Sequence, residues 1–264
     1  MISLFNSDVM SVDFSTIPPI NLIVTSPPYN CNISYDNHND AISYESYLNW
    51  CEQWLKKMYD VMADDGRICI NVPISITFDH LKKKGEEVVN YPISSDYIYL
   101  SKKIGFKFYR MIVWEKIGRN KTTWGSWRSA SAPFILDPNE CILIFYKHQW
   151  KRKSKGASTI SAKEFMTYTK NLWKMASETK SKHPAAFPLE LPDRCIKLFS
   201  YKEDIICDPF LGSGTSGESA IRLNRNFIGI EKSQLYFDMA KERISTAELQ
   251  TSIAKLIMPD ENEY

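Results

Sequence analysis

Short apolar runs alternate with segments of helical periodicity through most of the chain. Continuous apolar runs, typical of buried strands, occupy 21–25, 67–72, 140–146 and 226–230, and weaker ones occupy 109–114 and 204–207. Apolar residues at helical spacing predict helices over 44–62, 96–104, 189–199, 215–223 and 235–244, with Ser43 placed to cap the first of them. The alternation predicts an α/β fold, in which helices cover both faces of a mainly parallel sheet.

Three further features accompany this alternation. No helix separates the strand 109–114 from the strand 140–146, so we expect these two strands to form an antiparallel pair within the sheet. Residues 64–66 (Asp-Asp-Gly) predict a turn before the strand 67–72. The segment 115–139, rich in Arg, Lys, Trp, Ser and Pro, is predicted to be a loop region.

Charge is concentrated in one segment, although the whole chain of 264 residues has a net charge of only +2. Residues 147–182 contain ten Lys or Arg and two Glu. Such a segment can follow a phosphate backbone, and it can equally be a solvated surface.

The composition, with 44% hydrophobic and 24% charged residues, is that of an ordinary soluble protein with one large domain. No apolar run approaches the roughly 20 residues needed to cross a bilayer, and the N-terminus lacks a signal peptide, so we expect a cytoplasmic protein with no membrane partner. The six cysteines form no Cys-x-x-Cys pair and the four histidines show no ligand spacing, which predicts buried thiols and no metal site.

A glycine loop follows the strand 204–207 and opens the helix 215–223. It runs from Asp208 to Thr215 and contains Gly212 and Gly214, which allow a tight turn and the close approach of a ligand. Glu231 follows Gly214 by 17 residues, at the end of the next strand, where an acid can accept hydrogen bonds from ribose hydroxyls. An acid before the loop would repel pyrophosphate and favour an ammonium group. The pattern thus indicates a nucleoside cofactor with a methionine moiety, and its alternative is a glycine turn that only packs a helix on the sheet.

A proline motif follows the strand 21–25 directly. It consists of Ser26, Pro27, Pro28 and Tyr29. The prolines fix the backbone and remove two amide donors, so the Pro27 carbonyl and the Ser26 hydroxyl can both accept from one amino group, while Tyr29 can stack on a planar base. This arrangement suits a base flipped out of a duplex, and its alternative is a rigid strand-to-loop turn.

Together the two motifs resemble those of the DNA amino-methyltransferases that modify adenine N6 or cytosine N4. The proline motif precedes the glycine loop, and this order resembles the β group of that family, found in bacterial restriction-modification systems. The resemblance covers nearly the whole chain and implies a Rossmann-like fold around a seven-stranded, mostly parallel sheet. It also implies S-adenosylmethionine as the cofactor and double-stranded DNA as the partner, and it leaves room for a homodimer and a cognate restriction endonuclease. The residues it implies in cofactor binding are Asp8, His183, Asp208, Pro209, Phe210, Gly212, Gly214, Thr215 and Glu231.

Within this resemblance, Ser26 is the residue that bears on the target base. Serine at the first position of the motif is more typical of the cytosine-N4 enzymes, so we favour cytosine N4 and keep adenine N6 as the alternative. We assign residues 1–116 and 183–264 to catalysis and cofactor binding, and 117–182, which combine stacking aromatics with basic residues, to target recognition. The residues expected to contact DNA are Trp124, Trp127, Arg128, Lys151, Arg152 and Lys153.

Other functions are compatible with parts of the pattern. Methyl transfer to RNA or to a protein amide would use a similar proline motif, but the basic aromatic segment and the motif order favour DNA. A non-catalytic nucleic-acid-binding protein would not need the intact Asp208, Gly212, Gly214 and Glu231 set. A nicotinamide oxidoreductase would leave the proline motif unexplained.

Overall fold

The fold is built on one central sheet. The computed structural model describes residues 1–30, 34–35, 38–39, 42–77, 89–118, 126, 128–133, 135–178 and 187–257. In these residues the sheet has eight strands in the order β1-β12-β11-β2-β5-β9-β8-β10. Their bounds are β1 (Ile2–Asn6), β2 (Ile20–Thr25), β5 (Met62–Pro73), β8 (Lys107–Ile117), β9 (Glu140–Tyr146), β10 (Leu172–Ala176), β11 (Ile205–Asp208) and β12 (Asn226–Glu231). All neighbouring pairs are parallel except those of β9, which is antiparallel to β5 and β8.

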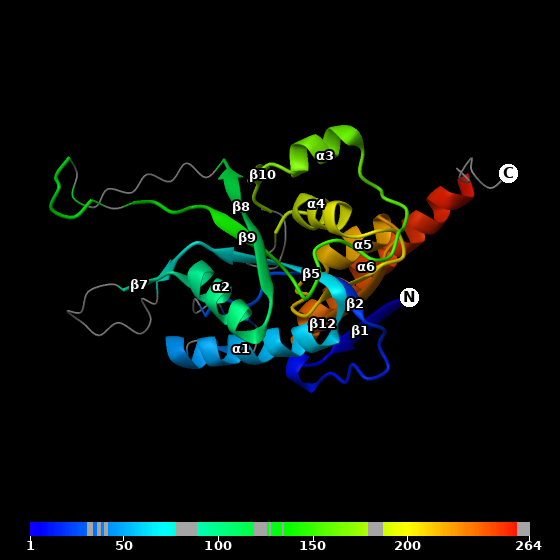
Figure 1. The fold of residues 1–264 in the computed structure, drawn as a ribbon, viewed down its shortest axis with the longest axis horizontal. Coiled ribbons are helices and arrows are strands. Elements are labelled where there is room, and N and C mark those ends of the chain that lie inside the picture. Colours follow the sequence, from blue (N-terminus) through cyan, green and yellow to red (C-terminus); the bar gives the residue numbers. More distant parts are fainter. Residues whose placement is uncertain are drawn as a thin grey trace.

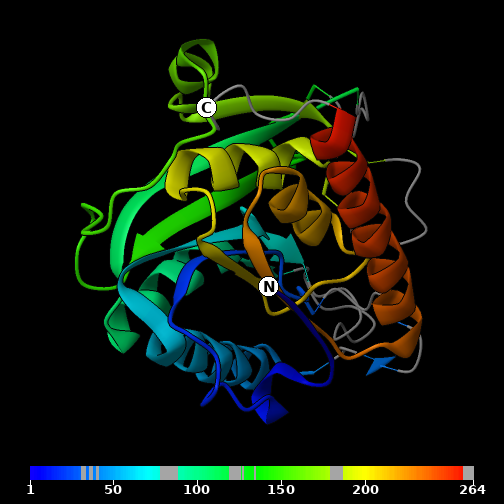
Figure 2. The same cartoon turned by 90° about the vertical axis from the view of Figure 1, so that its right-hand side faces the viewer.

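Helices cover both faces of this sheet, as predicted (Figures 1 and 2). One face carries α1 (Tyr44–Val61) and α2 (Ile93–Ile104), and the other carries α4 (Glu190–Phe199), α5 (Thr215–Arg222) and α6 (Gln234–Ile257). The short helix α3 (Ala162–Tyr168) packs on α4. The smaller elements are the 3₁₀ helix Val9–Ser11 and the two-stranded pairs β3 (Ser34–Tyr35) with β4 (His38–Asn39) and β6 (Ile76–Thr77) with β7 (Asn90–Tyr91). Among the described helices, none combines the length and the apolar character that a membrane crossing requires.

Local chemistry sets the helix boundaries. The Ser43 hydroxyl accepts a hydrogen bond from the backbone N–H of Ser46 and caps α1, as the sequence predicted. Helix α2 ends at Gly105, whose φ of 125° is open to glycine and strained for other residues. The chain can therefore turn there and enter β8 directly.

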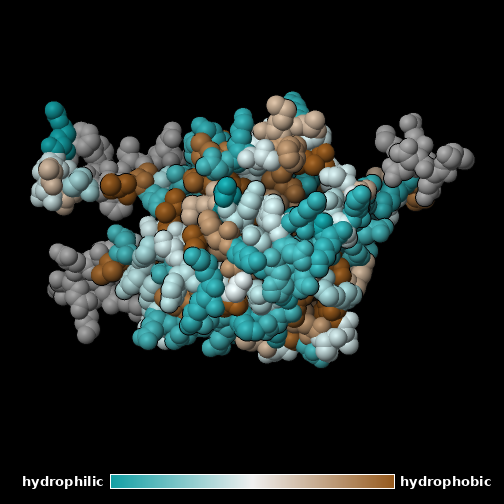
Figure 3. Space-filling view, in the orientation of Figure 1, coloured by the Kyte–Doolittle hydropathy of each residue, from teal (hydrophilic) through white to brown (hydrophobic). Residues whose placement is uncertain are grey.

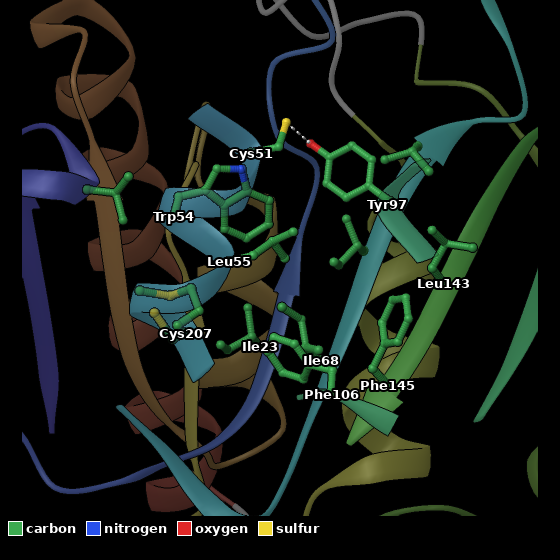
Figure 4. Packing of buried hydrophobic residues seen from close by; sticks show 14 of the residues in the cluster. Ile23, Cys51, Trp54, Leu55, Ile68, Tyr97, Phe106, Leu143, Phe145 and Cys207 are labelled. Carbon is green, nitrogen blue, oxygen red and sulfur yellow. Dashed lines mark hydrogen bonds between the residues drawn. The ribbon is translucent and has the colours of Figure 1, made fainter. Parts of the chain in front are cut away.

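The core lies in two layers, one on each side of the sheet. In the layer beneath α1 and α2, Trp54 and Leu55 pack on the strand residues Ile23, Ile68 and Phe145, all of them fully buried (Figure 4). Five of the six cysteines, Cys51, Cys69, Cys141, Cys195 and Cys207, are buried and free, as predicted, and Cys31 lies outside the described residues. Burial raises the pKa of the Cys51 thiol to about 12, so this thiol stays protonated at neutral pH.

Two edge strands were not predicted, so the sheet has eight strands, where the sequence pattern predicted six and the family resemblance implied seven. Strand β1 pairs with β12, and β10 pairs with β8. Strand β10 lies within 117–182, so the end of that range belongs to the central sheet and not to a separate module.

The turn predicted at 64–66 is also wrong. These residues form the irregular start of β5, where the register shifts between the Ile20–Met62 pair and the Leu22–Arg67 pair. A Cβ on Gly66 would lie 2.8 Å from the carbonyl oxygen of Ala63, so a residue without a side chain is needed at this close approach.

Candidate active site

The proline motif and the glycine loop meet at the carboxyl ends of two adjacent strands. Strands β2 and β11 pair in parallel; β2 ends at Thr25, directly before the proline motif, and β11 ends at Asp208, the first residue of the glycine loop. The Thr25 hydroxyl donates a 2.7 Å hydrogen bond to Asp208 Oδ1 across the two ends. In open α/β sheets the ligand lies beyond the carboxyl ends of the strands, so this junction marks the expected site.

Asp208 holds the start of the glycine loop. Its carboxyl accepts from the Ser216 hydroxyl over 2.6 Å and from the Phe210 backbone N–H over 3.0 Å, in addition to Thr25. The side chain is buried, and burial raises its pKa to about 6 in spite of these three donors. Asp208 therefore ties strand, loop and helix α5 together, and its contact with a cofactor stays a prediction.

The glycines shape the loop as predicted. Gly214 has a φ of 84° at the start of α5, and a Cβ there would lie 2.8 Å from the Ala240 Cα of α6. Gly212 has a φ of 52°, and its N–H donates to Glu231 Oε2 over 2.8 Å. Both positions need glycine, for conformation and, at Gly214, also for space.

Glu231 lies beside this loop at the end of β12. Its other oxygen, Oε1, accepts from the Ser233 N–H over 2.8 Å, and burial raises the pKa of the carboxyl. The backbone N–H of Lys232 also donates to this carboxyl, and a carboxylate offers about four lone-pair positions, so one remains for a ribose hydroxyl. The donor and acceptor set therefore fits the nucleoside part of S-adenosylmethionine.

The remaining predicted cofactor residues lie around the same edge. Asp8 caps the 3₁₀ helix after β1, and Lys232, the neighbour of Glu231, pairs with it over 3.2 Å. The Phe210 ring packs against α1, with its centroid 5.5 Å from that of Trp50. Pro209 is buried, and the Thr215 hydroxyl accepts from Arg243 over 2.7 Å. His183 lies outside the described residues.

The proline motif is held by a set of tyrosines. The Pro28 carbonyl accepts from the Tyr47 hydroxyl over 3.0 Å, whereas among the described residues the Pro27 carbonyl accepts no hydrogen bond. Tyr29 is buried, and its hydroxyl contacts the Ser26 hydroxyl and the backbone carbonyl of Asn71. The free Pro27 carbonyl fits the acceptor role predicted for it. The Tyr29 ring packs in the core beneath α1, and its stacking on a base stays a prediction.

Three polar residues that the sequence analysis missed lie behind this motif. The Asn71 amide Nδ2 donates to the Tyr29 hydroxyl over 3.1 Å and to Glu140 Oε2 over 2.5 Å, and Glu140 pairs in turn with Lys116. Asn71, Glu140 and Lys116 come from β5, β9 and β8, where the strand register puts them on one face. The signal available in the sequence was an acid at the start of the apolar run 140–146.

The predicted DNA contacts fall into two places. Residues 128–133 and 135–139, between β8 and β9, project beyond the body of the protein, and the apolar side chains of Ile135 and Leu136 are exposed there (Figures 1 and 3). In the segment between the two strands Arg128 is exposed, Ile135 is 86% exposed, and Trp124 and Trp127 lie outside the described residues. Since both strands reach the carboxyl edge of the parallel strands, the segment emerges on the side of the site.

Lys151, Arg152 and Lys153 lie at the opposite edge of the sheet. The Arg152 guanidinium donates to Asp204, the residue before β11, over 2.8 Å, and it pairs with Asp65 at the start of β5 over 3.4 Å. Its side chain is only 4% exposed, so we do not retain Arg152 as a DNA contact. Lys151 and Lys153 are exposed, but they lie near Asp65 and not near the site. Asn71, beside the proline motif, is six positions further along β5 than Asp65, which corresponds to roughly 20 Å. An open groove of about 370 Å³ in the described part of the chain also lies on this far side, between Met1, Asn226 and α6.

The fold and this site define a class of protein: a Rossmann-like methyltransferase that uses S-adenosylmethionine. A DNA methylase family model matches residues 20–242. The chain therefore belongs to the DNA methylase family of N6 and N4 methyltransferases, and it is a DNA amino-methyltransferase.

Individual relatives agree with this assignment. The chain is 42% identical over 181 residues to the type II methyltransferase M.MjaVI of Methanocaldococcus jannaschii, a match that covers 68% of this chain and 88% of that protein. It is similar in structure to the DNA modification methylase TTHA0409 of Thermus thermophilus complexed with S-adenosylmethionine, with a TM-score of 0.73, 25% identity and 94% of each chain covered. The cytosine-N4-specific PvuII DNA methyltransferase shares the fold at a TM-score of 0.69 and 19% identity, over 95% of this chain and 92% of its own.

Proposed function

We propose that this enzyme transfers a methyl group from S-adenosylmethionine to N4 of a cytosine held out of double-stranded DNA. The observation that carries the proposal is the hydrogen bond between Thr25 and Asp208, which places the proline motif beside the glycine loop. A base amino group at Ser26 would then lie next to a cofactor at Gly212 and Glu231. Proximity of the two reacting groups is the main requirement of a direct transfer.

The chain's own groups prepare the amine for attack. An exocyclic amine is a weak nucleophile, because its lone pair is delocalised into the ring. The Ser26 hydroxyl and the Pro27 carbonyl would accept one hydrogen bond each from the amino group and favour a tetrahedral nitrogen. When bound, S-adenosylmethionine supplies a methyl group activated by its positively charged sulfur. The described cysteines take no part, since all five are buried.

Ser26 is the basis for cytosine over adenine. A serine is a weaker proton acceptor than a carboxylate, which suits the more acidic amine of cytosine. Adenine N6 is the second candidate, because the same hydroxyl and carbonyl can hold an adenine amino group.

Target recognition would lie in the projecting segment between β8 and β9. This part of the range 117–182 contains exposed Arg128 and emerges on the side of the site. Phosphate contacts would position the duplex, and side chains of the segment would recognise bases. We further propose that the enzyme works alongside a cognate restriction endonuclease and forms a homodimer, by analogy with its family.

The test is methylation of a mixed-sequence duplex with labelled cofactor, followed by digestion to nucleosides and mass spectrometry. We expect N4-methylcytosine. N6-methyladenine would keep the reaction and overturn the choice of base. Transfer of the labelled methyl group to RNA or to protein, with none on DNA, would contradict the proposal that DNA is the substrate.

A pair of serine variants ties the reaction to the site. Ser26→Ala should lower kcat strongly while S-adenosylmethionine affinity stays within about twofold, because Ser26 belongs to the base site. Ser245→Ala, at an exposed position of α6, is the matched control and should behave as the wild type. Equal activity of the two variants would contradict the role of Ser26.

A further inference from the structure

A chain of hydrogen bonds leads from the proline motif across the carboxyl end of β5 to the adjoining ends of β9 and β8. It runs from Ser26 to Tyr29, Asn71, Glu140 and Lys116, and we call these five residues the relay. The relay is shielded from solvent: Asn71 is 2% exposed, and the Lys116 and Glu140 side chains are 11% and 15% exposed. Hydrogen bonds in such a setting are strong and hold their geometry.

The donor and acceptor of each hydrogen bond in the relay can be assigned by starting from the pair Lys116 and Glu140. The Lys116 ammonium can only donate, and the Glu140 carboxylate beside it can only accept. Glu140 therefore requires the NH₂ side of the Asn71 amide, and the amide oxygen finds no partner in the described part of the chain. The orientation of the Asn71 amide is thus fixed by Glu140.

The number of available protons then determines which group the Tyr29 hydroxyl donates to. This group has one proton, and it receives a hydrogen bond from Asn71 Nδ2. The backbone carbonyl of Asn71 lies 3.0 Å away and can only accept, so the Tyr29 proton points to it. If Tyr29 donated to Ser26 instead, two oxygen acceptors would face each other at 3.0 Å without a proton between them.

The Ser26 hydroxyl is therefore the donor in its short contact with Tyr29. Its proton points toward the protein, and its lone pairs remain for the substrate side. This direction matters for the chemistry, because the amine attacks through its nitrogen lone pair. A hydroxyl proton directed at that nitrogen would occupy the lone pair and suppress attack.

We propose that the relay keeps Ser26 in the acceptor orientation, and that Tyr29, Asn71, Glu140 and Lys116 are positioning residues for methyl transfer. The inference rests on the proposed function and adds a mechanism to it. Its consequence is that a polar contact between β8, β9 and β5 controls the nucleophile without touching it.

The experiment is a double-mutant cycle on Ser26 and Tyr29, read out as kcat in the labelled-DNA assay. Tyr29→Phe keeps the ring and removes the hydroxyl, so the Ser26 proton is free to turn toward the amine. We expect kcat to fall about tenfold, the upper end of the effect of losing one hydrogen bond between neutral groups. KM for DNA and the affinity for S-adenosylmethionine should change less than about threefold. In a Ser26→Ala background, Tyr29→Phe should have almost no further effect.

A second variant tests the far end of the relay. Glu140→Gln replaces the acceptor-only group with an amide that can face Asn71 by either side, so kcat should again fall at least about tenfold. Glu164→Gln is the matched control, because Glu164 forms a similar, partly buried pair with Lys197 at 2.5 Å, between α3 and α4. It should retain wild-type kcat, and thermal unfolding of both variants separates loss of fold from loss of orientation.

The outcomes distinguish the inference from the function it rests on. A wild-type enzyme that methylates DNA, with Tyr29→Phe and Glu140→Gln equally active, would overturn the relay alone. Independent, multiplicative effects of the Ser26 and Tyr29 changes would also overturn it, since Tyr29 would then act on its own. No methylation of DNA by the wild type would remove the proposed function first, and the relay with it.

Discussion

Replacing Asp208 with asparagine should make the protein more stable and a poorer enzyme. The amide oxygen of the Asp208→Asn variant would still accept from Thr25 and from the Phe210 N–H. The new NH₂ group would donate to the Ser216 hydroxyl, which can turn to accept. The three hydrogen bonds of the wild-type carboxyl are thus kept, and the buried charge is removed.

The magnitude follows from the pKa of Asp208, which burial raises from 3.8 to about 6. Below pH 4 the carboxyl is protonated in both the folded and the unfolded chain. Between pH 4 and 6 the unfolded chain loses its proton first, so the free energy of unfolding falls as pH rises. Above pH 6 the full cost is present, about 3 kcal/mol for a pKa raised from 3.8 to about 6.

The Asp208→Asn variant carries no such cost. At pH 8 we expect its free energy of unfolding to exceed that of the wild type by about 3 kcal/mol, which raises Tm by roughly 6 °C. At pH 5 the gain should shrink to about half. Urea unfolding followed by circular dichroism at both pH values measures the two differences. A variant that is less stable than the wild type at pH 8, or equally shifted at both pH values, would refute this reasoning.

The same variant should bind S-adenosylmethionine more weakly, because the negative charge beside the methionine ammonium is gone. Titration calorimetry measures this affinity directly. Unchanged affinity would show that Asp208 serves only to tie the loop to the strand ends.

Three further changes probe other parts of the structure. Gly214→Ala should lower the free energy of unfolding by about 3 kcal/mol or more, because backbone strain at its φ of 84° adds to a clash with α6. Gly118→Ala is the control in the same urea experiment. Gly118 has a φ of 85° with open space around it, so this variant measures the backbone strain alone. Arg152→Met should lower the free energy of unfolding by about 3–5 kcal/mol, because it leaves the carboxylates of Asp65 and Asp204 without their cation. The DNA affinity of this variant, measured by fluorescence anisotropy, should be unchanged. Lys151→Met is the control and should leave the free energy of unfolding unchanged. Glu231→Gln places an NH₂ group against a backbone N–H and should weaken S-adenosylmethionine binding at least about tenfold in calorimetry; affinity equal to the wild type would argue against Glu231 as a ribose ligand.

The elements predicted best from the sequence are those whose burial leaves an unambiguous pattern. The buried strand β9 was predicted with its observed bounds, and α1 within one residue, because a continuous apolar run and a long amphipathic segment admit few alternatives. Strand β10 was missed although Trp173 and Met175 are buried and alternate with exposed residues. The period of two was present, but five residues within a basic segment are too few to stand out.

The residues of the site also fall into those that a local sequence pattern predicted and those that it did not. The proline motif, the glycine loop and Glu231 are local patterns, and the structure brings them together at one edge. Asn71, Glu140 and Lys116 are polar residues at separate points of the chain, and only the register of β5, β9 and β8 makes them neighbours. Arg152 was predicted to contact DNA because it lies in a basic segment. The sequence does not reveal that carboxylates distant in the chain pair with it and bury its side chain.

The antiparallel pairing of β8 and β9 has a consequence for how such an enzyme diversifies. The segment between them leaves from one strand of the sheet and returns on the adjacent strand, so its two anchor points are set by the sheet and not by its own length or sequence. Lengthening a surface loop costs little free energy, about 0.6 kcal/mol for each doubling. Segments of different sequence can therefore be exchanged at this point while the rest of the sheet folds unchanged, and under the proposed role in target recognition such an exchange would change the DNA specificity.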